Sequence, residues 1–300
     1  MPEDYRGHYL TEGSRVAVIA PASPFDREDF ERGIAHLRER YDVRFDAGVL
    51  SRKGYLAGDD ARRLRELQDA IDDPGLDGIL AARGGYGATR LLGRLNTSAL
   101  SSHPKLLVGF SDITALHAQW ARQRVLSIHG AMVAALGRAE PKLVERHRRA
   151  LEGEFVESHS ELTTIAPGQA EGVLLGGNLT VLSALLATPH ALPAEGAVLF
   201  FEDVGERPYR IDRMLTTWRD AGAFAAVRGI VLGAFTQCDP GPDGVSTLDV
   251  LTERLSELGI PVVSGLPAGH IEDNAELPFG RRVSLDAARG ELQLLPRRIA

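Results

Sequence analysis

Strand-like runs alternate with helix-like segments through the first half of this 300-residue chain. The run RVAVIAP at residues 15–21 is apolar and ends in proline, as a buried strand does, and residues 26–41 space their apolar side chains as an amphipathic helix does. Further strands are predicted at residues 41–46, 77–82 and 105–109, further helices at residues 59–73 and 112–123, and a glycine-rich turn followed by a helix at residues 83–95. Because strands that alternate with helices form parallel sheets, the pattern predicts an α/β fold with a doubly wound parallel sheet.

A polar stretch at residues 156–169 interrupts this alternation and has no clear helical period. We interpret it as a linker between an N-terminal domain at residues 1–155 and a C-terminal domain at residues 170–300. The second domain carries the strand-like runs EGVLLGGN, GAVLFFEDVGE and RGIVLGAF and the helix-like segments NLTVLSALLAT, YRIDRMLTTWRDAGA and TLDVLTERLSEL. These elements predict a smaller domain of mixed α/β structure.

The composition excludes several classes of partner. The net charge is −7, so we expect neither a nucleic acid nor an anionic membrane surface as the main partner. The first residues lack the basic start and apolar centre of a secretory signal, and no apolar run approaches the length of a membrane span. The single cysteine, Cys238, lies in a turn-rich stretch, so we expect a structural thiol, no disulfide, no multi-cysteine metal site and a cytoplasmic location.

The stretch KLLVGFSDI at residues 105–113 places a serine between a predicted strand and a predicted helix. At the carboxyl end of a parallel strand the Ser111 hydroxyl faces the ligand-binding edge of the sheet, and the first N–H groups of the helix can hold a negative oxygen. The nucleophile elbow of α/β-hydrolases uses the same local design, although G-F-S-D-I departs from G-x-S-x-G at its last position. The competing interpretation is that Ser111 or Asp112 is an ordinary N-cap of the helix.

A serine nucleophile needs a histidine base and a carboxylate that orients the base. His270 is the candidate base, because it lies in the long irregular segment GLPAGHIEDNAELPFG after a predicted strand. His129 follows a strand-like run and is a second candidate for the same edge of the sheet. Four other histidines lie in polar or amphipathic stretches and are interpreted as surface residues: His8, His36, His147 and His159.

Glu202 is the candidate carboxylate. Four apolar residues run directly into Glu202 and Asp203, and charges at the end of a buried strand need a partner or a function. The alternative is an ordinary ion pair between Glu202 and an arginine such as Arg207 or Arg210.

Seven strings, taken in order, resemble the LD-carboxypeptidase family, the serine peptidases that include muramoyltetrapeptide carboxypeptidase and the microcin C self-immunity protein. The strings cover nearly the whole chain: VAVIAPASP, GYLAGDDARRLRELQDAIDDP, ILAARGGYGATRLL, KLLVGFSDITALH, LLGGNLTVLSALLATP, LFFEDVGERPYRIDRML and GLPAGHIEDN. Each string alone is weak, and their joint order is highly specific.

The resemblance implies a Ser-Glu-His triad in that chain order. The serine of the family's G-[FY]-S-D motif corresponds to Ser111, the first glutamate of E-D-x-x-E to Glu202, and the histidine of the glycine- and proline-rich loop to His270. The implied fold is a flavodoxin-like N-terminal domain that bears the nucleophile and a smaller C-terminal domain that bears the other two residues. The active site is then expected between the domains, and the protein is expected to be a homodimer.

Further site residues are predicted around this triad. The N–H of Asp112, directly after the nucleophile, is the natural first oxyanion donor, and Gly85 in RGGYG is the candidate second donor because glycine lets backbone approach a ligand closely. Gly84 and Tyr86 in the same turn are candidate substrate-binding residues. Asn178 in LLGGN is an N-cap by default, and the resemblance implies that its loop also faces substrate. A phosphate cradle is the rival interpretation of RGGYG, which lacks both G-x-G-x-x-G and a Walker lysine.

The predicted function is hydrolysis of the L,D peptide bond before the terminal D-alanine of murein tetrapeptides, without metal or cofactor. Alternatives are a microcin C immunity-type hydrolase that cleaves a peptide-nucleotide conjugate, and a binding protein that retains the scaffold without turnover. Arg210 and Arg213 in PYRIDRML are interpreted as structural ion-pair residues, with bidentate binding of a peptide carboxylate as the alternative role.

Overall fold

The computed structural model describes residues 3–298, which form two compact units. The N-terminal unit comprises Tyr5–Phe155 and Glu276–Pro278, and the C-terminal unit comprises residues 3–4, Val156–Ala275 and residues 279–298. Two separate sheets with flanking helices confirm the predicted α/β class. Within residues 3–298 no helix has both the length and the hydropathy needed to cross a bilayer.

The N-terminal unit is built on a six-stranded sheet in the order β12-β5-β4-β3-β1-β2. Its strands are β1 (Arg15–Ile19), β2 (Asp42–Arg44), β3 (Gly78–Ala81), β4 (Leu106–Gly109), β5 (Ser127–His129) and β12 (Leu277–Phe279). The first five strands pair in parallel, and β3 and β4 are buried at every position, as strands covered on both faces are. The carboxyl ends of β3, β4 and β5 therefore meet at one edge of the sheet.

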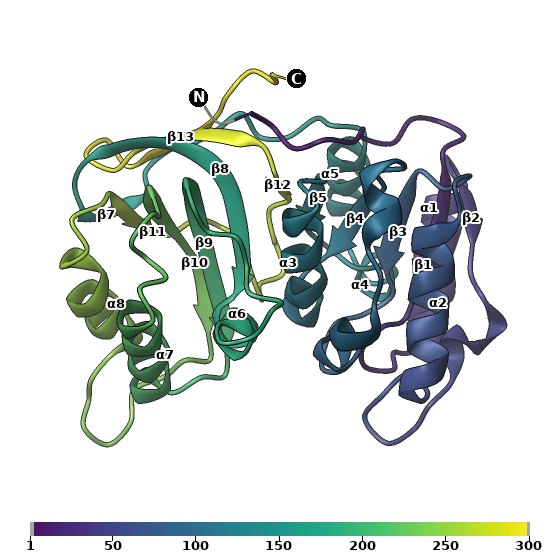
Figure 1. Cartoon of the computed structure of the whole chain (residues 1–300), viewed down its shortest axis with the longest axis horizontal. Coiled ribbons are helices and arrows are strands. Elements are labelled where there is room, and N and C mark those ends of the chain that lie inside the picture. The colour runs from purple at the N-terminus through teal and green to yellow at the C-terminus, as the bar shows by residue number, and fades with distance from the viewer. Residues whose placement is uncertain (1–2, 299–300) are drawn as a thin grey trace. The chain divides into compact units, whose positions relative to one another are not determined.

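Helices cover this sheet, and local sequence signals explain where two of them begin. The helices are α1 (Arg27–Arg38), α2 (Asp60–Asp72), α3 (Thr114–Arg122), α4 (Val133–Leu136) and α5 (Pro141–Leu151). Asp26 caps α1 by accepting from the N–H of Asp29, and Asp59 caps α2 by accepting from the N–H of Arg62. Figure 1 shows α2 and α3 against the same face of the sheet.

The helix predicted within residues 83–95 does not form. The structure has two single 3-10 turns there, η2 (Ala88–Arg90) and η3 (Leu92–Arg94). Gly87, at φ +135, precedes η2 without a side-chain cap, and Gly93 lies inside the segment. A missing cap and an interior glycine both lower the stability of an α-helix.

The C-terminal unit contains an eight-stranded mixed sheet in the order β6-β14-β13-β8-β9-β10-β11-β7. Its strands are β6 (Ser158–His159), β7 (Thr163–Ala166), β8 (Gln169–Asn178), β9 (Ala197–Val204), β10 (Gly229–Thr236), β11 (Val262–Ser264), β13 (Arg282–Asp286) and β14 (Glu291–Leu294). The central strands β8, β9, β10 and β11 are parallel, and the outer strands pair antiparallel. The polar stretch at residues 156–169 contributes β6 and β7 to this sheet.

Three predicted helices of the C-terminal unit are present: α6 (Leu179–Leu185), α7 (Pro208–Asp220) and α8 (Thr247–Ser256). Helices α7 and α8 lie side by side next to β9 and β10 (Figure 1). Ser246 and Asp249 form a capping box that begins α8, whereas α6 begins at the capping side chain of Asn178. Both α6 and α7 follow the carboxyl end of a parallel strand, which places their first residues at the edge where α/β proteins bind ligands.

Candidate active site

Ser111 occupies the corner between β4 and α3. Strand β4 ends at Gly109, a 3-10 turn, η5 (Ser111–Ile113), begins at the serine, and α3 follows directly. Ser111 has φ +63, a left-handed backbone conformation that costs a non-glycine residue roughly 1–2 kcal/mol. The nucleophile elbow also places its serine on a sharp, strained strand-to-helix turn. The half-buried Ser111 therefore shares this backbone feature with a nucleophile elbow and differs from an ordinary helix start.

The capping interpretation does not describe this corner. The residues that precede η5 and α3, Phe110 and Ile113, make no side-chain capping hydrogen bond. The Asp112 carboxylate is directed away from its own helix and accepts a hydrogen bond from the N–H of Ala88 at 2.8 Å. Asp112 thus connects the strand-to-helix corner at Ser111 to the segment that follows β3.

His117 on α3 forms a hydrogen bond with the last residue of β4. Its Nε2 lies 2.8 Å from the Gly109 carbonyl oxygen, and its Nδ1 lies 2.8 Å from the Ser127 hydroxyl. Burial lowers the pKa of His117 to about 4, so the imidazole is neutral, with Nε2–H donating to Gly109 and Nδ1 accepting from Ser127. His117 is thus a packed structural residue.

The glycine-rich turn at residues 84–87 lies directly against Ser111. A Cβ atom added to Gly84 would be 3.0 Å from the Ser111 Cβ and 3.3 Å from its Oγ. Ser23 holds the other side of the turn, because its N–H donates to the Gly84 carbonyl and its Oγ accepts from the N–H of Tyr86 at 3.1 Å. A Cβ atom added to Gly85, at φ +101, would be 2.4 Å from the Ser23 Oγ. Only glycine fits between Ser23 and Ser111.

The backbone N–H groups of Gly85 and Asp112 lie near Ser111 and make no hydrogen bond within residues 3–298. Asp112 is buried, whereas Gly85 is exposed. Unpaired N–H groups beside a strand-to-helix corner can stabilise a negative oxygen. The structure thus brings Ser111, Asp112, Gly84 and Gly85 together in the N-terminal unit. Tyr86 continues the same turn and is 47% exposed.

His270 and Glu202 are paired in the C-terminal unit. The Nδ1 of His270 lies 2.6 Å from Oε2 of Glu202, although the two residues are 68 positions apart in the chain. Glu202 lies on β9 and its side chain is fully buried, while that of His270 is 20% exposed. A carboxylate only accepts, so Nδ1 carries the proton of this bond and the basic lone pair of the ring is on Nε2. A carboxylate that orients a general base makes the same kind of contact.

The loop that carries His270 is built around Glu202. Gly269 has φ +125, and its N–H donates to the side-chain oxygen of Asn274 at 2.7 Å. A Cβ atom added there would lie 3.0 Å from both Cβ and Oε2 of Glu202. The loop also bonds to β10, because the N–H of Ala234 donates to the Ala268 carbonyl at 2.8 Å. The position of the imidazole is therefore set by packing on a buried sheet.

Asp203 and Asn178 form a second buried polar group beside Glu202. The Asn178 amide donates to Asp203 at 3.0 Å, and its oxygen caps α6 by accepting from the N–H of Val181. Asp203 also accepts from the N–H and the hydroxyl of Thr180, and burial raises the pKa of its carboxyl. Asn178 is in register with Glu202 on the neighbouring strand. The expected N-cap role of Asn178 is confirmed, and Asp203 is a structural acceptor.

The arginines after β9 do not pair with Glu202. Arg207 donates to the carbonyls of Asp239 and Pro240, and Arg210 forms an exposed ion pair with Glu206 at 3.4 Å. The ion-pair alternative for Glu202 is therefore wrong, whereas the structural ion pair expected for Arg210 is confirmed.

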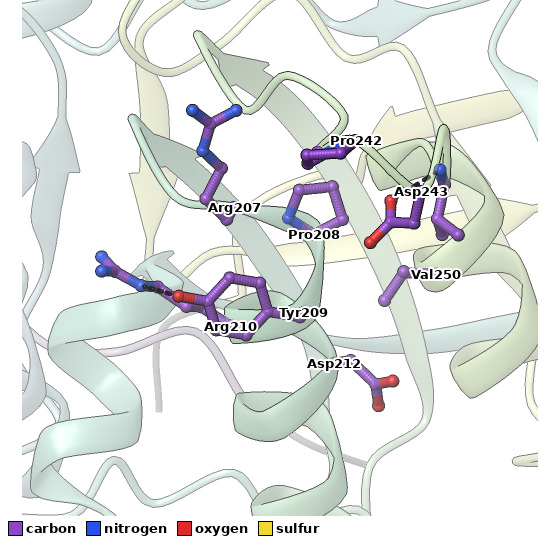
Figure 2. Close-up of a pocket in the computed structure, with 10 residues that line it drawn as sticks. Arg207, Pro208, Tyr209, Arg210, Asp212, Pro242, Asp243 and Val250 are labelled. Carbon is purple, nitrogen blue, oxygen red and sulfur yellow. Dashed lines mark hydrogen bonds between the residues drawn. The ribbon is translucent and has the colours of Figure 1, made fainter.

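A pocket of about 530 Å³ lies at the start of α7. Figure 2 shows that the rings of Pro208, Tyr209 and Pro242 form much of its wall, while the guanidinium groups of Arg207 and Arg210 point outward from it. Its other lining residues are Asp212, Gly241, Asp243, Val245 and Val250. It contains none of the residues that the sequence analysis singled out as catalytic.

His147 and Cys238, which lie outside the groups described above, are both buried. His147, expected at the surface, is 1% exposed, and its Nδ1 lies 3.2 Å from Glu276, which also binds Arg146 at 2.8 Å. The surface interpretation of His147 is wrong, because α5 turns this residue inward while its arginines face out. Cys238 is 5% exposed, and burial raises the pKa of its thiol to about 11, in keeping with the expected structural role.

Sequence reasoning missed the part played by Ser23. The string VAVIAPASP contributed to the resemblance without a role for any residue in it. A small hydroxyl residue after the carboxyl end of β1, at the same sheet edge as Ser111, is the signal from which a contact with the glycine-rich turn could have been predicted.

Comparison with known proteins completes this description. The family profile of the LD-carboxypeptidase N-terminal domain matches residues 16–130, and that of the LD-carboxypeptidase C-terminal domain matches residues 171–285. The chain belongs to the LD-carboxypeptidase family. The resemblance stated from the sequence is confirmed, and family membership makes the chain a serine-type carboxypeptidase, a hydrolase.

Two relatives of this LD-carboxypeptidase align with it over almost their whole length. A putative carboxypeptidase of Streptomyces coelicolor is 42% identical over 98% of this chain and 97% of its own. The murein tetrapeptide carboxypeptidase of Pseudomonas aeruginosa is 32% identical over 92% of this chain and 94% of its own.

Two solved structures are similar to this chain in fold. The crystal structure of muramoyltetrapeptide carboxypeptidase from Oxalobacter formigenes is 30% identical, with a TM-score of 0.82, and covers 95% of this chain and 100% of its own. The microcin C7 self-immunity protein MccF in complex with aspartyl sulfamoyl adenosine is 20% identical, with a TM-score of 0.85, and covers 98% of this chain and 99% of its own. At that identity the second likeness concerns the fold alone.

Proposed function

We propose that this LD-carboxypeptidase hydrolyses the L,D peptide bond before the terminal D-alanine of murein tetrapeptides, as part of cell-wall recycling. Relatives at 32% and 33% identity are named murein tetrapeptide carboxypeptidase and probable murein peptide carboxypeptidase, and a solved structure at 30% identity is a muramoyltetrapeptide carboxypeptidase. These names support murein peptides as the substrate class.

The proposed catalytic residues are Ser111, His270 and Glu202. The observation that carries the proposal is the 2.6 Å contact between His270 Nδ1 and Glu202 Oε2, because it gives the ring the tautomer that a general base needs. The strained backbone of Ser111, beside the unpaired N–H groups of Asp112 and Gly85, supports its role as the nucleophile.

In the proposed acylation step, His270 Nε2 removes the proton from the Ser111 hydroxyl as Oγ attacks the carbonyl carbon of the scissile bond. The N–H groups of Asp112 and Gly85 stabilise the resulting oxyanion. Collapse of the tetrahedral intermediate breaks the C–N bond, and the imidazolium returns the proton to the amine of the leaving D-alanine. Glu202 stabilises the imidazolium meanwhile.

In the proposed deacylation step, water replaces the departed amino acid. His270 takes a proton from this water, whose oxygen attacks the ester of the acyl-enzyme. The second intermediate collapses with return of the proton to Ser111 Oγ, and the shortened peptide leaves as a carboxylate. Each cycle consumes one water molecule, and no metal or cofactor takes part in it.

Several finer features belong to this proposal. Gly84, Tyr86 and Asn178 would contact substrate. The strand order β2-β1-β3-β4-β5 supports a flavodoxin-like N-terminal domain at residues 1–155. The proposal also includes a linker at residues 156–169 and a C-terminal domain at residues 170–300. The active site is proposed to lie between the domains. We also propose that the enzyme works in the cytoplasm as a homodimer.

Mass spectrometry of a murein tetrapeptide before and after incubation with the protein tests the proposal. Loss of one alanine residue is expected with the native chain and not with Ser111→Ala. A parallel incubation with a peptide-nucleotide conjugate tests the microcin C immunity-type alternative, which the MccF fold likeness leaves open. Cleavage of the conjugate with an intact tetrapeptide would replace the proposed substrate with that alternative.

A further inference from the structure

The carboxylate of Asp112 is buried at the point where the glycine-rich turn at residues 84–87 meets the nucleophile corner. It is 3% exposed, and its Oδ2 accepts from the N–H of Ala88 at 2.8 Å. The N–H of Gly87 also acts on it and, like that of Ala88, favours its ionised form. A buried carboxylate is costly unless it is well bonded, so this one holds a fixed place.

The opposite side of the same turn is held by Arg63 on α2. Arg63 is fully buried and donates to the carbonyl of Gly87 at 2.8 Å and to that of Pro21. Gly87 thus has its N–H on Asp112 and its carbonyl on Arg63. A Cβ atom added to Gly87 would be 2.6 Å from the guanidinium, so glycine is the residue that fits at this position.

The charges around Asp112 are few. Arg63 is the charged side chain that acts on its carboxyl, and Arg63 is itself paired with Asp60. Arg90, on the turn η2 that follows the glycines, is paired with the same Asp60 at 2.7 Å. Among the described residues, no negatively charged side chain acts on the Asp112 carboxyl. Burial is therefore the cause that disfavours ionisation of Asp112.

We propose that the side chain of Asp112 is a positioning residue that locks the Gly85 N–H to the nucleophile corner. This inference rests on the proposed function. The backbone of Asp112 provides one oxyanion donor, and its carboxylate bonds the turn that provides the other. One residue therefore fixes the distance between the two donors. The side chain itself touches no reacting atom.

The role predicts a particular kinetic signature. The donors act on charge that develops in the transition state, so a loosened turn lowers kcat and leaves KM nearly unchanged. The ionised carboxylate accepts two N–H groups, whereas an asparagine presents one acceptor and one donor. Asp112→Asn is therefore the informative variant, and Asp112→Ala is a second variant that removes the contact altogether.

The test combines activity with two readouts that need no murein substrate. These are the rate at which a fluorophosphonate labels Ser111, and the hydrogen-exchange rates of the Gly87 and Ala88 amides. Asp112→Asn is expected to slow labelling and to speed exchange at these amides by roughly tenfold or more each. We also expect the labelling rate of the native chain to fall at acidic pH as Asp112 is protonated, and this fall to shrink in the variant.

Asp29→Asn is the matched control, because Asp29 is also a buried carboxylate of the N-terminal unit but bonds Arg32 and Arg138 instead of the glycine-rich turn. It should keep native labelling, exchange and pH profile. Native labelling and exchange in both Asp112 variants would overturn the inference. If these readouts change as expected while the native chain releases no D-alanine, the positioning role stands and the proposed substrate fails.

Discussion

Gly269 packs directly against the side chain of Glu202, with room for no Cβ atom between them. The glycine precedes His270, so the same close approach that seats the backbone also brings the imidazole to the carboxylate. The proposed orienting acid and the proposed base are thus joined by packing as well as by a hydrogen bond.

Gly269→Ala is therefore expected to displace the imidazole. The added methyl group meets Glu202 at a backbone φ of +125, and a shift of about 1 Å costs on the order of 10²-fold in kcat. Steady-state kinetics on D-alanine release measures the loss. Gly222→Ala is the control, since Gly222 also has positive φ but open space around it. Equal losses of kcat in both variants would contradict the packing argument.

Substitution of Glu202 by glutamine tests the orienting role directly. The glutamine keeps the size of the side chain but removes the charge that fixes the Nδ1–H tautomer and stabilises the imidazolium. A loss of kcat on the order of 10³- to 10⁴-fold is expected. Native turnover in this variant would show that the contact with His270 is structural only.

Two substitutions of Ser111 test whether its backbone is strained. Both Ser111→Ala and Ser111→Gly should abolish release of D-alanine. Glycine adopts the φ of +63 without strain, so Ser111→Gly should unfold with a free energy about 0.5–1 kcal/mol higher than that of Ser111→Ala, after allowance for the greater entropy of glycine in the unfolded chain. Urea denaturation compares them, and the reverse order would remove the strain argument.

Asp112→Asn should also change how stability depends on pH. Burial raises the pKa of this carboxyl from 3.8 to about 6, so ionisation destabilises the folded state. The penalty is absent below pH 4, grows through pH 4–6 and reaches about 3 kcal/mol above the folded-state pKa. The variant lacks it, so its free energy of unfolding should rise relative to that of the native chain between pH 4 and pH 7. A constant difference across that range would contradict the raised pKa.

Tyr55 and Tyr86 form an exposed aromatic pair beside the glycine-rich turn, with ring centroids 5.7 Å apart and exposures of 64% and 47%. If Tyr86 contacts substrate as proposed, Tyr86→Ala and Tyr55→Ala should raise KM by roughly threefold to tenfold and leave kcat within about twofold. Tyr209→Ala, at another exposed tyrosine, is the control. Unchanged KM in both variants of the pair would remove this surface from the substrate site.

The parts of the fold that were predictable from sequence depend on local signals. The helices predicted at residues 26–41 and 59–73 are present as α1 and α2. Asp26 and Asp59 directly precede these helices and cap their first turns. The apolar run into Glu202 is another local signal. It predicts β9, because a continuous apolar run is typical of a strand that is buried on both faces.

The features that were not predictable depend on distant contacts. The helix expected in residues 83–95 is replaced by short turns, and the glycines before it serve the contact with Ser111 and Arg63 instead. His147 is buried because Glu276, far along the chain, bonds its ring. The positive φ of Ser111 likewise has no local signature, as only the close approach of Gly84 accompanies it. Local propensity cannot report such tertiary effects.

The burial of Cys238 is an advantage for site-specific labelling of the protein. It is the sole cysteine of the chain, and a thiol that is buried and hard to ionise reacts slowly with alkylating reagents. A cysteine introduced at the exposed position 83, next to the glycine-rich turn, would therefore take up a fluorescent or spin probe selectively, without removal of the native sulfur. Motion of the glycine-rich turn during turnover could then be followed by spectroscopy in an otherwise unaltered enzyme.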